Sequence, residues 1–209
     1  MRSNPRSPRP GSTPVDSLDL VSRLLAGDEL LFASLVERWY PGLHRLAEAL
    51  TGDAATAEQL VLETWASALR SLETFEVRSA LRTWVHRVCA QVALARLRQD
   101  HRSPAPDAPS VDPGRFDEHG TWRDPPCQWM EETPERLVAR TEVMERIQRA
   151  VVTLPAVQRA VFTLRDLEGF GSEETCEILG ISEAHQRVLL HRARTRVRSE
   201  CERFYREAA

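Results

Sequence analysis

The stretch that decides the fold is Ser172-Glu-Glu-Thr-Cys-Glu-Ile-Leu-Gly-Ile-Ser-Glu-Ala-His-Gln-Arg-Val-Leu-Leu-His-Arg192. Two segments in it carry apolar residues at helical spacing, and a Gly-Ile dipeptide separates them. Ser172 and Ser182 stand where the two helices would begin, and serine is a favoured N-cap. A short helix, a turn with glycine and a longer helix make the helix-turn-helix plan. The sequence therefore predicts helices over 172–179 and from 183 to about 205. Small or apolar residues would fill their crossing: Cys176, Leu179, Ile181, Val188 and Leu189.

This plan predicts a protein that binds double-stranded DNA, because the first turns of the second helix enter the major groove. Glutamine can pair there with adenine and arginine with guanine. The polar candidates for base contacts are His185, Gln186, Arg187, His191 and Arg192. Three further arginines are predicted to touch phosphates: Arg194, Arg196 and Arg198. Charge alone would fit an ordinary solvated helix face equally well, so the prediction depends on the two capped helices and the glycine between them.

The remaining chain predicts an all-α protein of two small helical domains, because no segment alternates with the period of a strand. We expect a disordered tail over 1–16, a helical domain over 17–100, a linker over 101–134 and the helix-turn-helix domain over 135–209. Seven prolines and many acidic residues mark the linker. Within the domains, Pro41-Gly42 is expected to end a helix, Asp53 to cap the longest helix, and Pro155 to stand at the first position of another. Trp122 and Trp129 are unusual in a linker and suggest a local docking contact, with simple packing onto either domain as the alternative.

Charge is distributed unevenly although the net charge is only −3. Residues 103–145 hold ten acidic residues and four arginines, whereas 82–102 hold five arginines and one aspartate. All 28 basic residues are arginine, which binds phosphate as a planar fork, although a GC-rich genome would explain the same bias. Residues 180–209 hold seven arginines and four glutamates. Two basic stretches thus flank an acidic one, as suits contacts with nucleic acid at two places.

Several function classes are not expected. The N-terminus has no apolar core of a secretory signal and no apolar run nears the roughly 18 residues that cross a bilayer, so we expect a cytoplasmic protein without membrane insertion. Metalloprotease, P-loop, dinucleotide-binding and nucleophile-elbow motifs are missing, so neither an enzyme nor a cofactor is expected. His86 and Cys89 lie one helical turn apart and could form half of a metal site, but a thiol packed in the core is the simpler interpretation.

A family resemblance adds to these predictions. The segments Leu154-Pro155, Arg159 to Gly169, Glu174 to Glu183 and Leu190 to Arg194 resemble region 4 of sigma factors of the extracytoplasmic-function (ECF) type in the sigma-70 family. Region 4 of that family reads the −35 promoter element. The resemblance adds Val188 to the base-contacting candidates. Leu189 stands where the family commonly has a basic residue, which predicts an altered choice of −35 sequence.

Residues 28–100 resemble region 2 of the same family. The segment 53–65 resembles its polymerase-binding helix, which docks on a coiled coil of the polymerase β′ subunit, and 82–98 resembles its −10 helix. The resemblance implies core polymerase, promoter DNA and an anti-sigma factor as partners. It assigns polymerase contacts to Glu58, Gln59, Leu62 and Glu63. Residues on the −10 helix would hold melted DNA by arginine charge and aromatic stacking, with the loop 73–79 as a base pocket: Arg82, Trp84, His86, Arg87 and Gln91.

Trp84 shares a stripe with core residues, so a packing role is the alternative for that position. For the whole chain, a free-standing helix-turn-helix regulator is the alternative to a promoter-specificity subunit. Gln59, Leu62, Gln91 and Ala95 differ from residues that are common in the family, so the promoter sequence does not follow from the resemblance.

Overall fold

The structure is a computed structural model that describes residues 14–75, 79–99 and 147–207. These residues form helices and turns and contain no strand, as the sequence predicts. The predicted linker, with Trp122 and Trp129, lies outside the described residues. Helix α1 (Pro14–Leu25) begins inside the predicted tail, because a proline fits the first turn of a helix. None of the described helices is long and apolar enough to cross a membrane.

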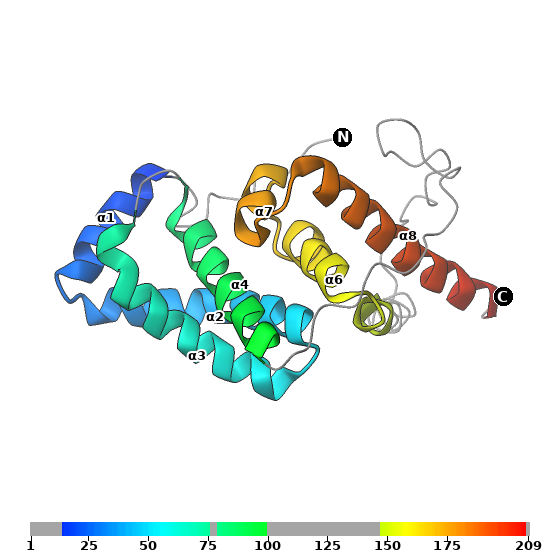
Figure 1. Cartoon of the computed structure of the whole chain (residues 1–209), viewed down its shortest axis with the longest axis horizontal. Helices are drawn as coiled ribbons and strands as arrows, with labels where there is room; N and C mark the ends of the chain where they lie inside the picture. The colour runs from blue at the N-terminus through cyan, green and yellow to red at the C-terminus, as the bar shows by residue number, and fades with distance from the viewer. Residues whose placement is uncertain (1–13, 76–78, 100–146, 208–209) are drawn as a thin grey trace, which may run out of the picture.

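The N-terminal domain is built on three long helices, α2 (Glu29–Thr51), α3 (Ala54–Ser71) and α4 (Leu81–Gln99), with the short turn η1 (Leu72–Thr74) before α4. Figure 1 shows α3 and α4 running beside each other, with α2 passing behind them. Asp28 and Asp53 cap α2 and α3, since their carboxylates accept hydrogen bonds from Leu31 N at 2.9 Å and Thr56 N at 2.7 Å. Gly52 ends α2 in the left-handed region. Asp53 is the N-cap of α3, so its predicted cap is confirmed.

The predicted helix stop at Pro41-Gly42 is wrong, because α2 runs through both residues. A proline inside a helix costs about 3 kcal/mol in lost hydrogen bonding and crowding. Here the helix is buried on both sides of the proline, with Trp39, Leu43 and Leu46 each no more than 3% exposed. Tertiary packing of these side chains outweighs the local cost.

The C-terminal domain contains α6 (Ala156–Phe162), the π-helical turn η3 (Thr163–Leu167), α7 (Ser172–Leu179) and α8 (Glu183–Glu207). Gly180 turns the chain between α7 and α8 with a φ of 65°, and Ser182 Oγ accepts a hydrogen bond from His185 N at 3.2 Å. The predicted turn and the Ser182 cap are confirmed. The cap at Ser172 is wrong by one position, since Gly171 is the N-cap and its N–H donates a hydrogen bond to Glu174 Oε2 at 2.7 Å. Pro155 is likewise the N-cap of α6 rather than its first residue.

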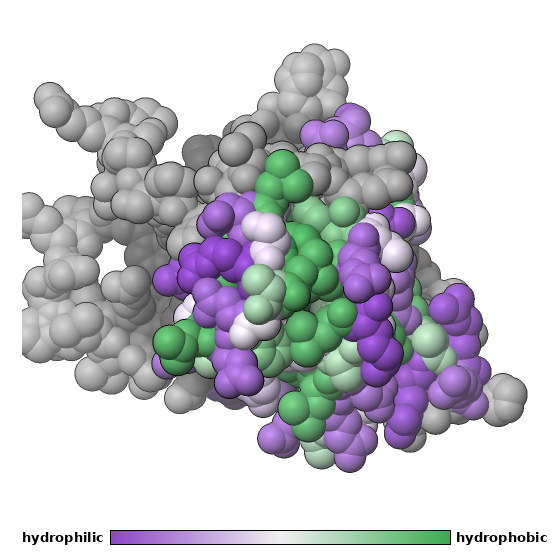
Figure 2. All heavy atoms as spheres, turned by 90° about the vertical axis from the view of Figure 1, so that its left-hand side faces the viewer, coloured by the Kyte–Doolittle hydropathy of each residue, from purple (hydrophilic) through white to green (hydrophobic). Residues whose placement is uncertain are grey.

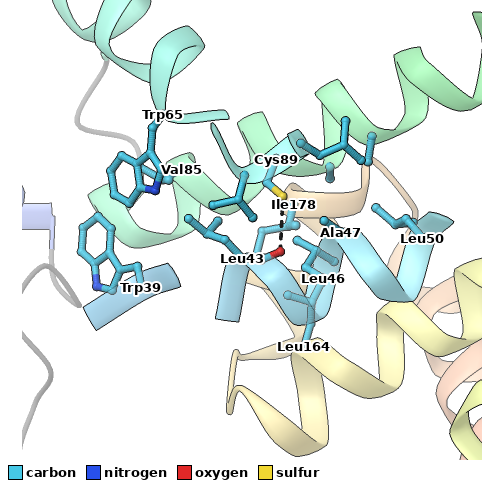
Figure 3. Close-up of a cluster of buried hydrophobic side chains, with 14 of the residues drawn as sticks. Trp39, Leu43, Leu46, Ala47, Leu50, Trp65, Val85, Cys89, Leu164 and Ile178 are labelled. Atoms are coloured by element: carbon cyan, nitrogen blue, oxygen red, sulfur yellow. Dashed lines mark hydrogen bonds between the residues drawn. The ribbon is translucent and has the colours of Figure 1, made fainter. Parts of the chain in front are cut away.

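The two domains pack against each other and share one hydrophobic core. Leu164 and Ile178 of the C-terminal domain lie among Leu43 and Leu46 of α2, and all four are at most 2% exposed (Figure 3). Arg159 of α6 strengthens this junction, since its Nε donates to the Ala49 carbonyl at 2.6 Å. The side of the molecule that carries α1 instead exposes apolar side chains, which form a band in Figure 2. Large apolar side chains of α1, the start of α2 and the end of α3 are exposed: Leu18, Leu25, Leu30 and Leu69.

Candidate nucleic-acid interface

The start of α8 presents an exposed polar face to solvent. His185, Arg187 and Val188 are all exposed there, and Val188 keeps 46% of its surface. Figure 1 places α8 on the outer side of the C-terminal domain, away from α2 and α3. Arg187 makes only a long contact of 3.4 Å to Glu183, on a pair that is more than 60% exposed. These three side chains could contact base edges without any rearrangement.

Two residues of the same turns face inward instead. Gln186 is 1% exposed, and its Oε1 accepts a hydrogen bond from Ser172 Oγ at 3.0 Å. Leu189 is also 1% exposed and packs with Val161 and Leu190. Gln186 is predicted to contact a base. In this structure its side chain is buried instead and joins α8 to Ser172 of α7. Leu189 lies in the core, so its side chain does not face a major groove in this arrangement, and its effect on −35 reading stays a prediction. Positions 186, 189, 190 and 193 follow helical spacing, so the inward stripe could have been found from the sequence.

The later residues of α8 are mostly engaged within the protein. Arg194 forms two hydrogen bonds with the Asp166 carboxylate, at 2.9 and 2.6 Å, which raise the pKa of its guanidinium. Arg198 Nε donates to Glu202 at 2.6 Å, whereas Arg196 is exposed. His191 and Arg192 are half-buried, and burial followed by the charge of Arg192 lowers the pKa of His191. Of the three predicted phosphate contacts, Arg196 is the most accessible.

The five predicted −10 residues of α4 divide into two groups. Arg87 and Gln91 are exposed, and half-buried Trp84 stacks edge-on against Phe75 with centroids 5.5 Å apart. Arg82 and His86 lie on the neighbouring face, which the C-terminal domain covers. Of the predicted base-pocket loop, residues 76–78 lie outside the described residues. Three of the five −10 candidates are thus reachable from solvent in this arrangement.

His86 and Cys89 are core residues. His86 is fully buried, its Nδ1 lies 2.8 Å from the Arg82 carbonyl, and burial followed by the charge of Arg82 lowers its pKa to about 3. Burial raises the pKa of Cys89 to about 12, and its Sγ donates to the Leu43 carbonyl at 3.7 Å. Both side chains are packed in the core, which is the environment that the packed-thiol interpretation expects.

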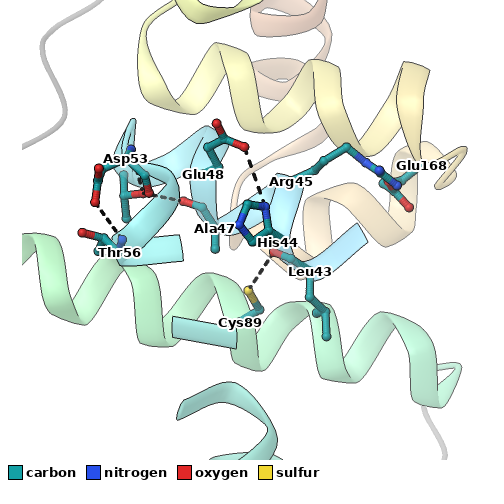
Figure 4. A network of polar contacts seen from close by, with 10 residues as sticks. Leu43, His44, Arg45, Ala47, Glu48, Asp53, Thr56, Cys89 and Glu168 are labelled. Carbon is teal, nitrogen blue, oxygen red and sulfur yellow. Dashed lines mark hydrogen bonds and ion pairs between the residues drawn. The ribbon is translucent and has the colours of Figure 1, made fainter. Parts of the chain in front are cut away.

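A buried carboxylate at the domain junction is the feature that sequence reasoning missed. Glu168, directly after η3, is only 6% exposed. Arg45 of α2 reaches it at 2.6 Å and Arg82 of α4 at 3.1 Å (Figure 4 shows the Arg45 side). The carboxylate sits against Gly42, where a Cβ atom would lie 2.7 Å from its Oε2. Nothing in helical spacing distinguishes Glu168 from a solvent-facing acid, because its partners come from distant helices.

The predicted polymerase-binding residues form one exposed face of α3. Glu58, Gln59, Leu62 and Glu63 all point to solvent, and Leu62 keeps 66% of its surface. The opposite face of α3 is buried through Ala57, Leu60 and Val61. An apolar side chain rimmed by acids is a surface suited to a partner that offers both apolar and basic groups.

Comparison with known proteins decides what this architecture is. Residues 35–103 match Sigma-70 region 2, and residues 144–197 match Sigma-70, region 4. The chain belongs to the sigma-70 family as an ECF-type RNA polymerase sigma factor. The resemblance stated from its motifs is thereby confirmed, and so is the all-α architecture with a helix-turn-helix at the C-terminal end.

The relatives are distant but cover nearly the full chain. The ECF RNA polymerase sigma-E factor of Salmonella typhimurium is 28% identical over 178 residues, which cover 84% of this chain and 88% of that protein. The RNA polymerase sigma-H factor of Pseudomonas aeruginosa is 27% identical over 190 residues, covering 90% and 95%.

Two solved structures share the fold. CnrH, solved in complex with the cytosolic domain of CnrY, has a TM-score of 0.57 at 18% identity and covers 88% of this chain and 95% of its own. RpoE of Bartonella quintana, solved with the anti-sigma factor NepR, has a TM-score of 0.56 at 21% identity, covering 82% and 96%.

Proposed function

We propose that this sigma factor binds core polymerase through α3 and recognises a promoter at two elements, with α8 at −35 and α4 at −10, to direct transcription initiation. The observation that carries the proposal is the exposed start of α8 in a capped helix-turn-helix. His185, Arg187 and Val188 are free of core packing there, so the helix can enter a major groove. We assign base contacts to these three and leave Gln186 a structural role.

The −10 role of α4 is supported by chemistry on its surface. Trp84, Arg87 and Gln91 combine an aromatic ring, a charge and an amide, and aromatic stacking contributes about 1–3 kcal/mol per base in single-strand binding. Arg82 and His86 would join them when the C-terminal domain moves away. The exposed Leu62 on α3, between Glu58 and Glu63, would dock on the β′ coiled coil of the polymerase.

We further propose an anti-sigma factor as a partner. Both solved structures named above contain such a fold bound to a second protein, a cytosolic domain of CnrY or the anti-sigma factor NepR. The apolar band of Figure 2 is a surface of the kind that protein partners cover. Because transcription takes place at the chromosome, the proposed function places the protein in the cytoplasm.

Reconstituted transcription tests the proposal. The chain is mixed with core polymerase and genomic DNA fragments, and transcript starts are mapped. We expect defined starts that disappear without the chain, and Arg187→Ala should weaken them about tenfold, as for loss of one good base contact. Arg38→Ala, an exposed arginine on α2 outside the proposed contacts, is the matched control and should leave them unchanged.

Failure to bind core polymerase would contradict the proposal. Tight, specific binding of duplex DNA by the chain alone would support the alternative of a free-standing regulator.

A further inference from the structure

The face of α4 that carries Arg82, Thr83 and His86 is occupied by the C-terminal domain. Figure 1 shows α7 lying beside the first turns of α4. Thr83 is fully buried, Arg82 keeps 12% of its side-chain surface and His86 none. These residues belong to the basic helix for which we propose contacts with melted DNA. The segment that covers them therefore controls when DNA can reach this face of α4.

Carboxylates fill the positions around this face. Glu168 binds Arg82 Nη2 at 3.1 Å, and Glu174 Oε1 accepts a hydrogen bond from Thr83 Oγ1 at 2.9 Å. One turn further along both helices, Glu177 lies 3.7 Å from Arg87 Nη1. Three acids from one continuous segment thus follow α4 in register. Arginine and hydroxyl side chains are the groups that contact phosphate oxygens in DNA complexes.

An aromatic ring completes the arrangement. Phe170 is 2% exposed, and the Arg82 guanidinium lies 4.0 Å from its ring centroid. The His86 ring meets the same ring edge-on, with centroids 4.8 Å apart. A nucleic-acid base has a flat face of the same kind, on which arginine and histidine stack.

We infer that residues 168–177 act as an internal mimic of single-stranded DNA, with Glu168, Glu174 and Glu177 in place of phosphates and Phe170 in place of a base. The mimic and promoter DNA would compete for one face of α4. The protein by itself is then held closed, and the −10 face becomes available when the C-terminal domain swings off. This inference rests on the proposed −10 role of α4.

The geometry explains why the closed state is specific rather than a loose contact. Glu168 is held from two helices, by Arg45 of α2 and by Arg82 of α4, and charge-assisted hydrogen bonds of this kind are about twice as strong as neutral ones. Since Arg45 belongs to neither DNA-contacting helix, it anchors the acid independently of the face that DNA would use.

The test measures binding of a fluorescein-labelled single-stranded DNA of mixed sequence to the full-length chain by anisotropy. Glu168→Gln keeps the shape of the side chain and removes its charge, so we expect about tenfold tighter binding than wild type. Arg45→Gln releases the same acid from the other side without altering α4 or α7, and should also tighten binding. Glu37→Gln, an exposed glutamate on α2 outside the mimic, is the matched control and should change nothing.

Hydrogen exchange on the same samples distinguishes opening from unfolding. We expect faster exchange in residues 172–179 and in the first turns of α4, with α3 unchanged, both in Glu168→Gln and in wild type saturated with the DNA. Equal DNA affinity in wild type and both variants, or faster exchange throughout α3, would overturn the inference.

The two proposals fail in different ways. If Trp84→Ala and Arg87→Ala leave promoter-dependent transcription intact, the −10 role of α4 is wrong. If they abolish transcription while Glu168→Gln and Arg45→Gln leave DNA affinity unchanged, only the mimic is wrong.

Discussion

Replacing Gly42 with alanine places a methyl group at the centre of the domain junction. In the interior of a helix, alanine is favoured over glycine by about 1 kcal/mol, so this change in α2 would ordinarily stabilise the protein. Here the new Cβ would lie 2.7 Å from Glu168 Oε2 and 3.2 Å from His86 Nε2. The carboxylate cannot simply turn aside, because Arg45 and Arg82 hold it in a site that is 6% exposed.

The gain in helix propensity and the cost of overpacking together give the expected change in the stability of the junction. Overpacking a filled site costs about 1–3 kcal/mol, so the helix gain is cancelled or exceeded and the junction loosens by about 0–2 kcal/mol. Shortening Glu168 to alanine removes the nearer contact and leaves His86 Nε2 at 3.2 Å, a distance that a small shift of the ring relieves. In that background Gly42→Ala should recover its ordinary gain of about 1 kcal/mol. The double-mutant cycle should therefore give an interaction energy of about 1–3 kcal/mol.

The assay compares wild type, both single variants and the double variant in full-length protein. Urea unfolding gives the free energy of unfolding, and hydrogen exchange reports whether α7 is released from α4 before α2 and α3 unfold. We expect Gly42→Ala alone to speed exchange in α7. If Gly42→Ala stabilises the wild type and the Glu168→Ala background by the same amount, the steric reasoning about this junction is refuted.

Three further predictions distinguish side chains that stabilise the fold from side chains that contact a partner. Native His86 stays neutral with a pKa of about 3, whereas in the unfolded chain it takes up a proton below about pH 6.5. Lowering the pH from 7 to 5 should therefore remove about 2 kcal/mol of the free energy of unfolding. In urea titrations His86→Gln should lack this share of the loss, and the same pH dependence in variant and wild type would contradict the prediction. Gln186→Ala should lower the melting temperature, because it removes the buried amide that accepts a hydrogen bond from the half-buried Ser172 hydroxyl. Arg187→Ala should instead leave the melting temperature unchanged and weaken promoter binding. The reverse pattern would contradict both assignments. Leu62→Ala should weaken binding of core polymerase in a pull-down while the melting temperature stays the same, because this side chain is 66% exposed; unchanged binding would remove α3 as the docking face.

Features that depend on neighbours in sequence followed from the sequence. The caps at Asp53 and Ser182 satisfy helix ends within three residues of themselves. The exposed face of α3 and the buried stripe of α8 repeat with the helix period, so a pattern of apolar residues is enough to locate them. The family motifs lie in these same local segments, so the resemblance to sigma factors depends on the order of residues and not on their long-range contacts.

Only the tertiary structure decided which polar residues are hidden and by what. Glu168 lies 123 residues from Arg45 and 86 from Arg82, so no local pattern links the acid to its partners. The same holds for His86, whose burial comes from Phe170 across the junction, and for Pro41, where packing of α2 overrides the local tendency of the helix to end. Sequence periodicity says which face of a helix is apolar, but a polar face can meet either solvent or a complementary surface from another domain. That choice depends on the summed energy of long-range contacts, which exists only once the chain has folded.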